Sequence, residues 1–142
     1  MQTLKNTIKL LFLVSVLTAT QVSAEILVIV NKSNNMRSIS AQDLKNIYLG
    51  KSKKFPNGKR VEPLNLDYDG TREKFEAKIL GKNKSALGRY WSKRIFTGKG
   101  KPPKSIGDDR DMVEKVSRSV NAIGYVKAGQ ATNKVKVIYR LR

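Results

Sequence analysis

The segment from Val61 to Leu80 constrains the fold of this chain more than any other. A short apolar run reaches a polar turn at Asp69 and Gly70, and the turn opens directly into a helix whose apolar face begins at Phe75. A strand, a glycine turn and a helix start bring backbone N–H groups and the positive end of the helix dipole to one point. The segment therefore predicts a strand–turn–helix unit that can hold an anion.

A simpler interpretation of the same turn stays open. Asp69 stands where a helix N-cap is expected, and Asp is among the residues most favoured there. In that case its carboxylate accepts the helix N–H groups itself, and the turn binds no ligand.

Other apolar runs alternate with helical patterns along the chain. Strands separated by helices imply a mainly parallel sheet with helices on both faces. We therefore predict an α/β fold of three layers. The expected strands are 26–30, 61–66, 122–126 and 135–141, and the expected helices are 40–49, 71–80, 85–95 and 108–120.

The first 24 residues are typical of a secretory signal peptide. Lys5 and Lys9 precede an apolar core at Leu10–Leu17, and Val22 and Ala24 are small residues suited to a cleavage site. The apolar core is too short for a membrane span. We expect cleavage after Ala24, a periplasmic location, and one domain of residues 25–142 that does not span the membrane.

The chain is strongly basic, with 29 Lys and Arg residues against 11 Asp and Glu residues and a formal net charge of +18. Such a charge favours acidic partners, namely phosphates, anionic lipid headgroups or acidic proteins. Nucleic acid is not expected as a partner of an exported protein. A solvated, lysine-rich surface without a partner is the alternative.

Cysteine and histidine are both absent. Their absence removes the Ser-His-Asp and Cys-His nucleophile systems and the usual zinc ligand sets. Asp67, Asp69 and Glu73 could form a carboxylate pair or an oxygen-ligand metal site. Acidic residues at a helix start are more often capping residues, so we expect no enzyme, no metal and no cofactor.

Five motifs in a fixed order resemble a known family, the small exported proteins related to the periplasmic substrate-binding component of phosphate ABC transporters. The similarity runs from Ile26 to about Val126. The motifs are ISAQDLKNIYLGK (39–51), FPNGK (55–59), DGTREKF (69–75), YWSKRIFTGKGKPP (90–103) and NAIGYV (121–126).

This resemblance implies a single lobe of a type 2 periplasmic-binding-protein fold. Full-length members close two lobes on a phosphate, and their turn reads Arg-x-Asp-x-Ser-Gly-Thr. Asp67, Gly70 and Thr71 match that pattern, whereas Asp69 replaces the Ser and Asn65 replaces the Arg. A carboxylate repels a phosphate dianion, and the loss of the guanidinium removes a bidentate contact.

The candidate ligand-binding residues lie in two loops. Ligands of parallel sheets bind outside the carboxyl ends of the strands. We therefore expect the loop Asn31–Ser33 and the turn that begins at Asp67, called the Asp67 turn below, to share one edge of the sheet. The candidates are Ser33, Asp67, Asp69, Gly70, Thr71 and Arg72.

Two functions follow as hypotheses. The first is a periplasmic solute-binding-like protein that binds phosphate or another small anion in connection with an ABC transport system. The alternative is an adaptor of the cell envelope whose basic surface contacts a transporter, a membrane sensor protein or an anionic lipid surface. A single lobe needs a second chain to close a cleft, and a dimer is one way to supply it.

Overall fold

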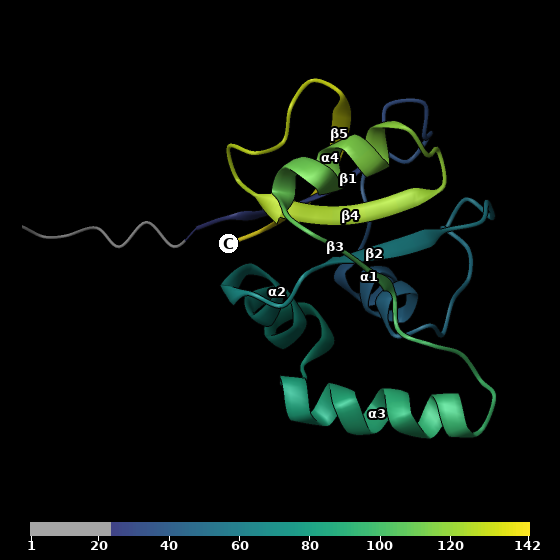
Figure 1. Ribbon diagram of the computed structural model, residues 1–142. Helices are drawn as coiled ribbons and strands as arrows, with labels where there is room; N and C mark the ends of the chain where they lie inside the picture. Colours follow the sequence, from purple (N-terminus) through teal and green to yellow (C-terminus); the bar gives the residue numbers. More distant parts are fainter. Residues whose placement is uncertain (1–23) are drawn as a thin grey trace, which may run out of the picture.

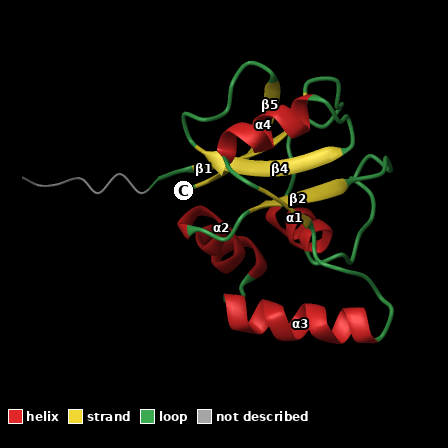
Figure 2. Cartoon of the chain, viewed as in Figure 1, coloured by secondary structure: helices red, strands yellow, loops and turns green. Residues whose placement is uncertain are grey.

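The computed structural model describes residues 24–142, and the predicted signal peptide lies outside the described residues except for Ala24. Within these described residues, five strands alternate with helices (Figures 1 and 2). The strands are β1 (Ile26–Asn31), β2 (Glu62–Leu66), β3 (Lys104–Ile106), β4 (Ala122–Lys127) and β5 (Val135–Leu141). The helices are α1 (Ala41–Tyr48), α2 (Gly70–Phe75), the π-helix η1 (Glu76–Leu80), α3 (Lys84–Phe96) and α4 (Asp109–Ser117).

The strands form one sheet in the order β3-β2-β4-β1-β5. β2 pairs in parallel with both β3 and β4, whereas β1 pairs antiparallel with both β4 and β5. Four strands therefore run in one direction and β1 runs against them. The prediction of a mainly parallel sheet is confirmed, but the reversal of β1 has consequences for the site.

Helices cover both faces of the sheet, as predicted. α4 lies on one face, and α1 and α2 lie on the other (Figure 1). The α4 side chains Met112, Val113 and Val116 are buried against the sheet. They approach β4 closely because Gly124 has no side chain, and a Cβ at that position would collide with Met112. α3 lies farther out, beyond α1 and α2 (Figure 1).

Three aromatic rings join the second helical layer to the sheet. Phe75 at the end of α2 stacks on Tyr125 of β4 with 3.9 Å between ring centroids, and Tyr48 of α1 meets Phe75 edge-on at 4.9 Å. The Tyr48 hydroxyl donates to the backbone carbonyl of Leu64 at 2.9 Å. All three rings are fully buried, so they fix α1 and α2 against β2 and β4.

Three local expectations need correction. β3 was not among the expected strands, because its three residues carry little apolar signal and are held in the sheet by pairing with β2. The helix that starts after Asp69 ends before Gly81 as predicted, but its second half, Glu76–Leu80, is a π-helix. Val120 lies beyond the end of α4 and is exposed.

Within residues 24–142, no helix combines the length and the hydropathy needed to cross a bilayer.

Candidate ligand-binding site

The candidate site lies at the edge of the sheet where β2 and β4 end. β2 ends at Leu66 and leads into the turn before α2. β4 ends at Lys127, which pairs with Ile26 at the start of the reversed strand β1. This edge is where the carboxyl ends of parallel strands place ligands in α/β folds.

The Asp69 turn caps the helix as the simpler interpretation expects. The Asp69 carboxylate accepts the backbone N–H of Arg72 at 2.9 Å, and its backbone is extended, as in an N-cap. Thr71 lies in the first turn of α2 and is buried. One donor at the helix start is therefore already satisfied by the protein itself.

A cavity of about 310 Å³ adjoins this helix start. Asp69, Gly70 and Thr71 line it together with two basic residues, Lys74 and Lys127. The Lys74 Nζ also donates to the backbone carbonyl of Ala24 at 2.7 Å. The residues that line the cavity thus include a threonine, a glycine and two lysines, with a single acidic residue.

Arg72 turns away from this cavity. Its Nε donates to Glu76 Oε1 at 2.6 Å, and its Nη1 donates to the Leu66 carbonyl at 3.1 Å and to Ser105 Oγ at 3.2 Å. These contacts tie α2 to β2 and β3. The guanidinium is neutralised by the buried Glu76 carboxylate, so it is poorly suited to hold a second anion.

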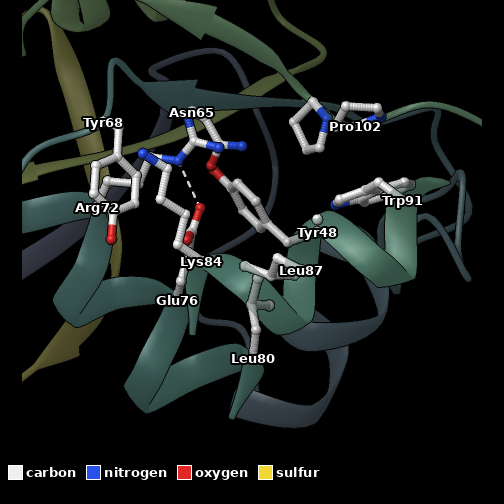
Figure 3. A pocket seen from close by; sticks show the side chains of 12 residues that line it. Tyr48, Asn65, Tyr68, Arg72, Glu76, Leu80, Lys84, Leu87, Trp91 and Pro102 are labelled. Atoms are coloured by element: carbon white, nitrogen blue, oxygen red, sulfur yellow. Dashed lines mark hydrogen bonds and ion pairs between the residues drawn. The ribbon is translucent and has the colours of Figure 1, made fainter. Parts of the chain in front are cut away.

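Arg72 and Glu76 instead line a second cavity, of about 300 Å³ (Figure 3). The rings of Tyr48, Trp91 and Pro102 border it as well (Figure 3). Most of its walls are apolar, Arg72 is paired with Glu76, and the ammonium of the third charged residue, Lys84, lies over the Tyr68 ring at 4.2 Å from its centroid. This cavity therefore offers packing surface rather than an anion site.

Asn65, which stands where the resembling family has an arginine, serves the interior. It is buried, and its Oδ1 accepts the Tyr125 hydroxyl at 3.1 Å. The Tyr125 hydroxyl in turn accepts the Leu66 N–H at 3.4 Å. Asn65 therefore completes a buried hydrogen-bond chain across β2 and β4.

The expectation that the Asn31–Ser33 loop shares the edge of the Asp67 turn is wrong. Because β1 runs antiparallel to β4, its carboxyl end lies at the opposite edge. There the Asn31 amide donates to carbonyls at the end of α4, and the Ser33 N–H donates to Asn31 Oδ1 at 2.9 Å. Ser33 is thus part of a turn that caps α4, far along the sheet from Thr71.

Asp67 lies at the expected edge but does not line the cavity of the helix start. It is exposed, and its backbone N–H continues the pairing with β3 by donating to the Ile106 carbonyl at 2.9 Å. Of the six candidate residues, the cavity gathers Asp69, Gly70 and Thr71.

Lys74 and Lys127 are the residues that sequence reasoning missed. Lys74 lies one helical turn after Gly70, so the two share a face of the helix. Lys127 ends a parallel strand, and the rule that selected the Asp67 turn applies equally to it. In a chain with so many lysines, neither stood out by composition.

Asp109, at the start of α4, adds a negative charge near this edge. Burial raises the pKa of its carboxyl above the ordinary value of 3.8, and the charges of Asp69 and Asp108 raise it further. Lys127 opposes these effects through its charge and through its backbone N–H. The charge of Lys127 is therefore partly offset by a carboxylate of the protein itself.

The raised pKa of Asp109 predicts a pH effect on stability. A folded state that holds the proton more tightly than the unfolded state loses stability as the pH rises from 3.8 through the folded pKa. We expect Asp109→Asn to remove this loss, since the amide can still accept the Lys127 N–H. Urea unfolding measures the free energy of unfolding of both proteins. The gain of the variant over the parent chain should be larger at pH 7 than at pH 3.5, and an equal difference at both pH values would contradict the prediction.

No protein-family model matches this chain, and no curated protein matches it in sequence. Solved structures do match. A structure described as an ABC-type phosphate transport receptor from Vibrio cholerae has a TM-score of 0.65 and 20% identity over 81% of this chain. A protein from Clostridium perfringens, described as a phosphate ABC transporter substrate-binding protein with bound phosphate, has a TM-score of 0.64, also with 20% identity over 81% of the chain.

This chain has the fold of one lobe of these receptors. PstS from Borrelia burgdorferi agrees with a TM-score of 0.60 at 14% identity. The match covers 46%, 45% and 47% of the three solved chains, so this chain spans about half their length. The prediction of a single lobe of a type 2 periplasmic-binding-protein-like fold is confirmed.

Proposed function

We propose that this chain is a solute-binding-like lobe that takes a small oxyanion, with phosphate the first candidate, in the cavity beside α2. The observation that carries the proposal is the gathering of Gly70, Thr71, Lys74 and Lys127 around one cavity at the ligand edge of the sheet. A hydroxyl, exposed backbone and two ammonium groups are donors suited to an oxyanion. The phosphate receptors that share the fold support this choice.

The carboxylate of Asp69 bears on which oxyanion is preferred. A carboxylate accepts hydrogen bonds but repels other negative charges. Phosphate keeps a proton near neutral pH and can donate it to a carboxylate, whereas sulfate has none to donate. We therefore expect phosphate to bind more tightly than sulfate.

A single lobe supplies contacts from one side only. The ligand then stays partly in water, where each charge–charge contact is weak. We expect a dissociation constant on the order of 0.1–1 mM, or roughly 4–5.5 kcal/mol of binding free energy. A second copy of the chain or a component of an ABC transport system would complete the cleft. Export to the periplasm belongs to the same proposal.

Isothermal titration of residues 24–142 tests the proposal. Phosphate should bind, and Thr71→Val and Lys127→Gln should each weaken binding about fivefold or more, since a charged hydrogen bond contributes roughly 1.5–3 kcal/mol and an exposed one less. Lys32→Gln, which removes the same charge at the opposite edge, should leave binding unchanged.

Two results would contradict the proposal. The first is the absence of heat with phosphate at millimolar concentration. The second is equal weakening by Lys32→Gln and Lys127→Gln, because it would mean that phosphate responds to the net charge and not to the cavity.

A further inference from the structure

A long part of the chain carries positive charge only. Between Glu76 and Asp108 the sequence holds nine Lys and Arg residues and no Asp or Glu. This stretch contains α3 and the loop that leads from α3 to β3. α3 lies at the outside of the molecule, on the side away from α4 (Figure 1). Six of these nine residues lie on α3 or in the loop after it, so this projecting part of the molecule carries positive charge and no carboxylate side chain.

The end of α3 exposes two large apolar side chains. Phe96 is 93% exposed and Ile95 is 56% exposed, whereas Leu87 and Trp91 of the same helix are buried against the body of the domain. Among residues 24–142, no other large hydrophobic side chain is as exposed as Phe96. The helix is therefore already anchored by its inner face, and Phe96 takes no part in that packing.

The turn after Phe96 is well defined and brings lysines beside it. The Thr97 N–H donates to the Lys93 carbonyl at 3.0 Å, and the Lys99 N–H donates to the Arg94 carbonyl at 2.8 Å. The Arg94 guanidinium donates to the Gly50 carbonyl at 3.1 Å, which ties the turn to the end of α1. Five exposed residues form what we call the α3 tip. They are Lys93, Ile95, Phe96, Lys99 and Lys101.

The positive charge continues from the α3 tip into a neighbouring groove. Lys99 and Lys101 line a cavity of about 640 Å³ whose other basic residues are Lys53, Arg60 and Lys104, with Glu62 as its one acidic residue. Gathering these cations costs electrostatic repulsion, which an anionic surface would relieve. The tip and the groove thus present cations around a protruding aromatic ring.

We propose that the α3 tip docks on an anionic membrane surface, with Phe96 and Ile95 in the interfacial layer and the lysines on lipid phosphates. Aromatic residues framed by Lys and Arg are typical of surfaces that lie on anionic bilayers. Interfaces with other proteins are depleted of Lys, so the same composition disfavours an acidic protein as the partner. The apolar side chains also protrude, as insertion into lipid requires.

Vesicle flotation with residues 24–142 tests this inference, because the apolar N-terminal segment would itself bind lipid. The vesicles contain either phosphatidylcholine alone or phosphatidylcholine with phosphatidylglycerol. The variants are Phe96→Ala, the double change Lys99→Gln/Lys101→Gln, and a matched double change Lys32→Gln/Lys115→Gln. Lys32 lies beyond β1 and Lys115 lies on α4, and both are exposed.

We expect binding to the anionic vesicles only, with a strong decrease between 0.05 and 0.5 M salt. Lys99→Gln/Lys101→Gln should lower the partition coefficient about tenfold or more, since each basic residue near such a surface contributes roughly a fivefold gain. Phe96→Ala should lower it about tenfold, as expected for an aromatic ring partly removed from water. The Lys32→Gln/Lys115→Gln variant should lose markedly less than the Lys99→Gln/Lys101→Gln variant.

A fluorescent variant locates the contact. Phe96→Trp should retain binding, and brominated lipid should quench its emission more than it quenches the emission of the parent chain, whose single tryptophan is buried.

Equal losses in the two lysine double variants would overturn the proposal, because binding would then follow net charge alone. Unchanged binding of Phe96→Ala would also overturn it. Binding to an acidic polypeptide but not to anionic vesicles would do the same, and would assign the tip to a protein partner.

Discussion

Arg72→Met is expected to destabilise the domain by about 3 kcal/mol, because it leaves the Glu76 carboxylate buried without its cation. The two side chains meet at 2.6 Å, and Glu76 is only 4% exposed. The variant also loses the bonds from Arg72 to the Leu66 carbonyl and to Ser105. Against a total stability of about 5–15 kcal/mol for a domain of this kind, the loss would be large.

Chemical denaturation of Arg72→Met, Glu76→Leu and the double variant measures the coupling. The double variant should recover most of the loss, since an apolar pair of similar volume can replace a buried ion pair at little cost. A matched control is the Lys134–Glu114 pair, which also meets at 2.6 Å but is exposed. Lys134→Met should cost under about 1 kcal/mol, and a cost equal to that of Arg72→Met would contradict the role of burial.

Phe75→Ala is expected to destabilise the domain by about 3–5 kcal/mol, the usual cost of removing a buried aromatic ring. Phe75 is fully buried between Tyr48 and Tyr125, and its removal leaves a cavity between α2 and the sheet. Thermal unfolding measures the loss. Because α2 carries Gly70, Thr71 and Lys74, the candidate anion site should lose its geometry together with the core.

Phe96→Ala is a matched control for Phe75→Ala. The same atoms are removed, but Phe96 is 93% exposed and fills no cavity. We expect a change within about 0.5 kcal/mol, as for other surface substitutions. A similar loss in both variants would contradict the packing described for Phe75, and a stable Phe96→Ala protein also supports its use in the vesicle experiment.

The strand–turn–helix unit at Val61–Leu80 was predictable because its signals are local. The apolar run, the capping Asp69 and the terminating Gly81 each act within a few residues, and the structure has a strand, an N-cap and a left-handed glycine there. β3 was missed because its three residues have no local signal and depend on pairing with β2.

Which residues belong to the candidate site depends on the direction of each strand in the sheet. Local sequence patterns do not encode that direction. Ser33 follows the buried strand β1 and Lys127 ends the buried strand β4, and the sequence alone placed only Ser33 in the candidate site. The antiparallel pairing of β1 with β4 sends Ser33 to one edge and brings Lys127 to the other, beside Ile26 and the start of α2.

The sequence by itself determined the α/β class and the Asp69 turn. It also excluded nucleophilic chemistry by cysteine or histidine, because the chain contains neither residue. Hydrophobic periodicity and capping are short-range, so one sequence suffices to recognise them. The tertiary structure alone decided that Arg72 pairs with Glu76, that Lys74 and Lys127 meet at the cavity, and that Phe96 faces solvent. Those outcomes depend on which strands pair and which face each helix buries, and such contacts join residues far apart in the chain.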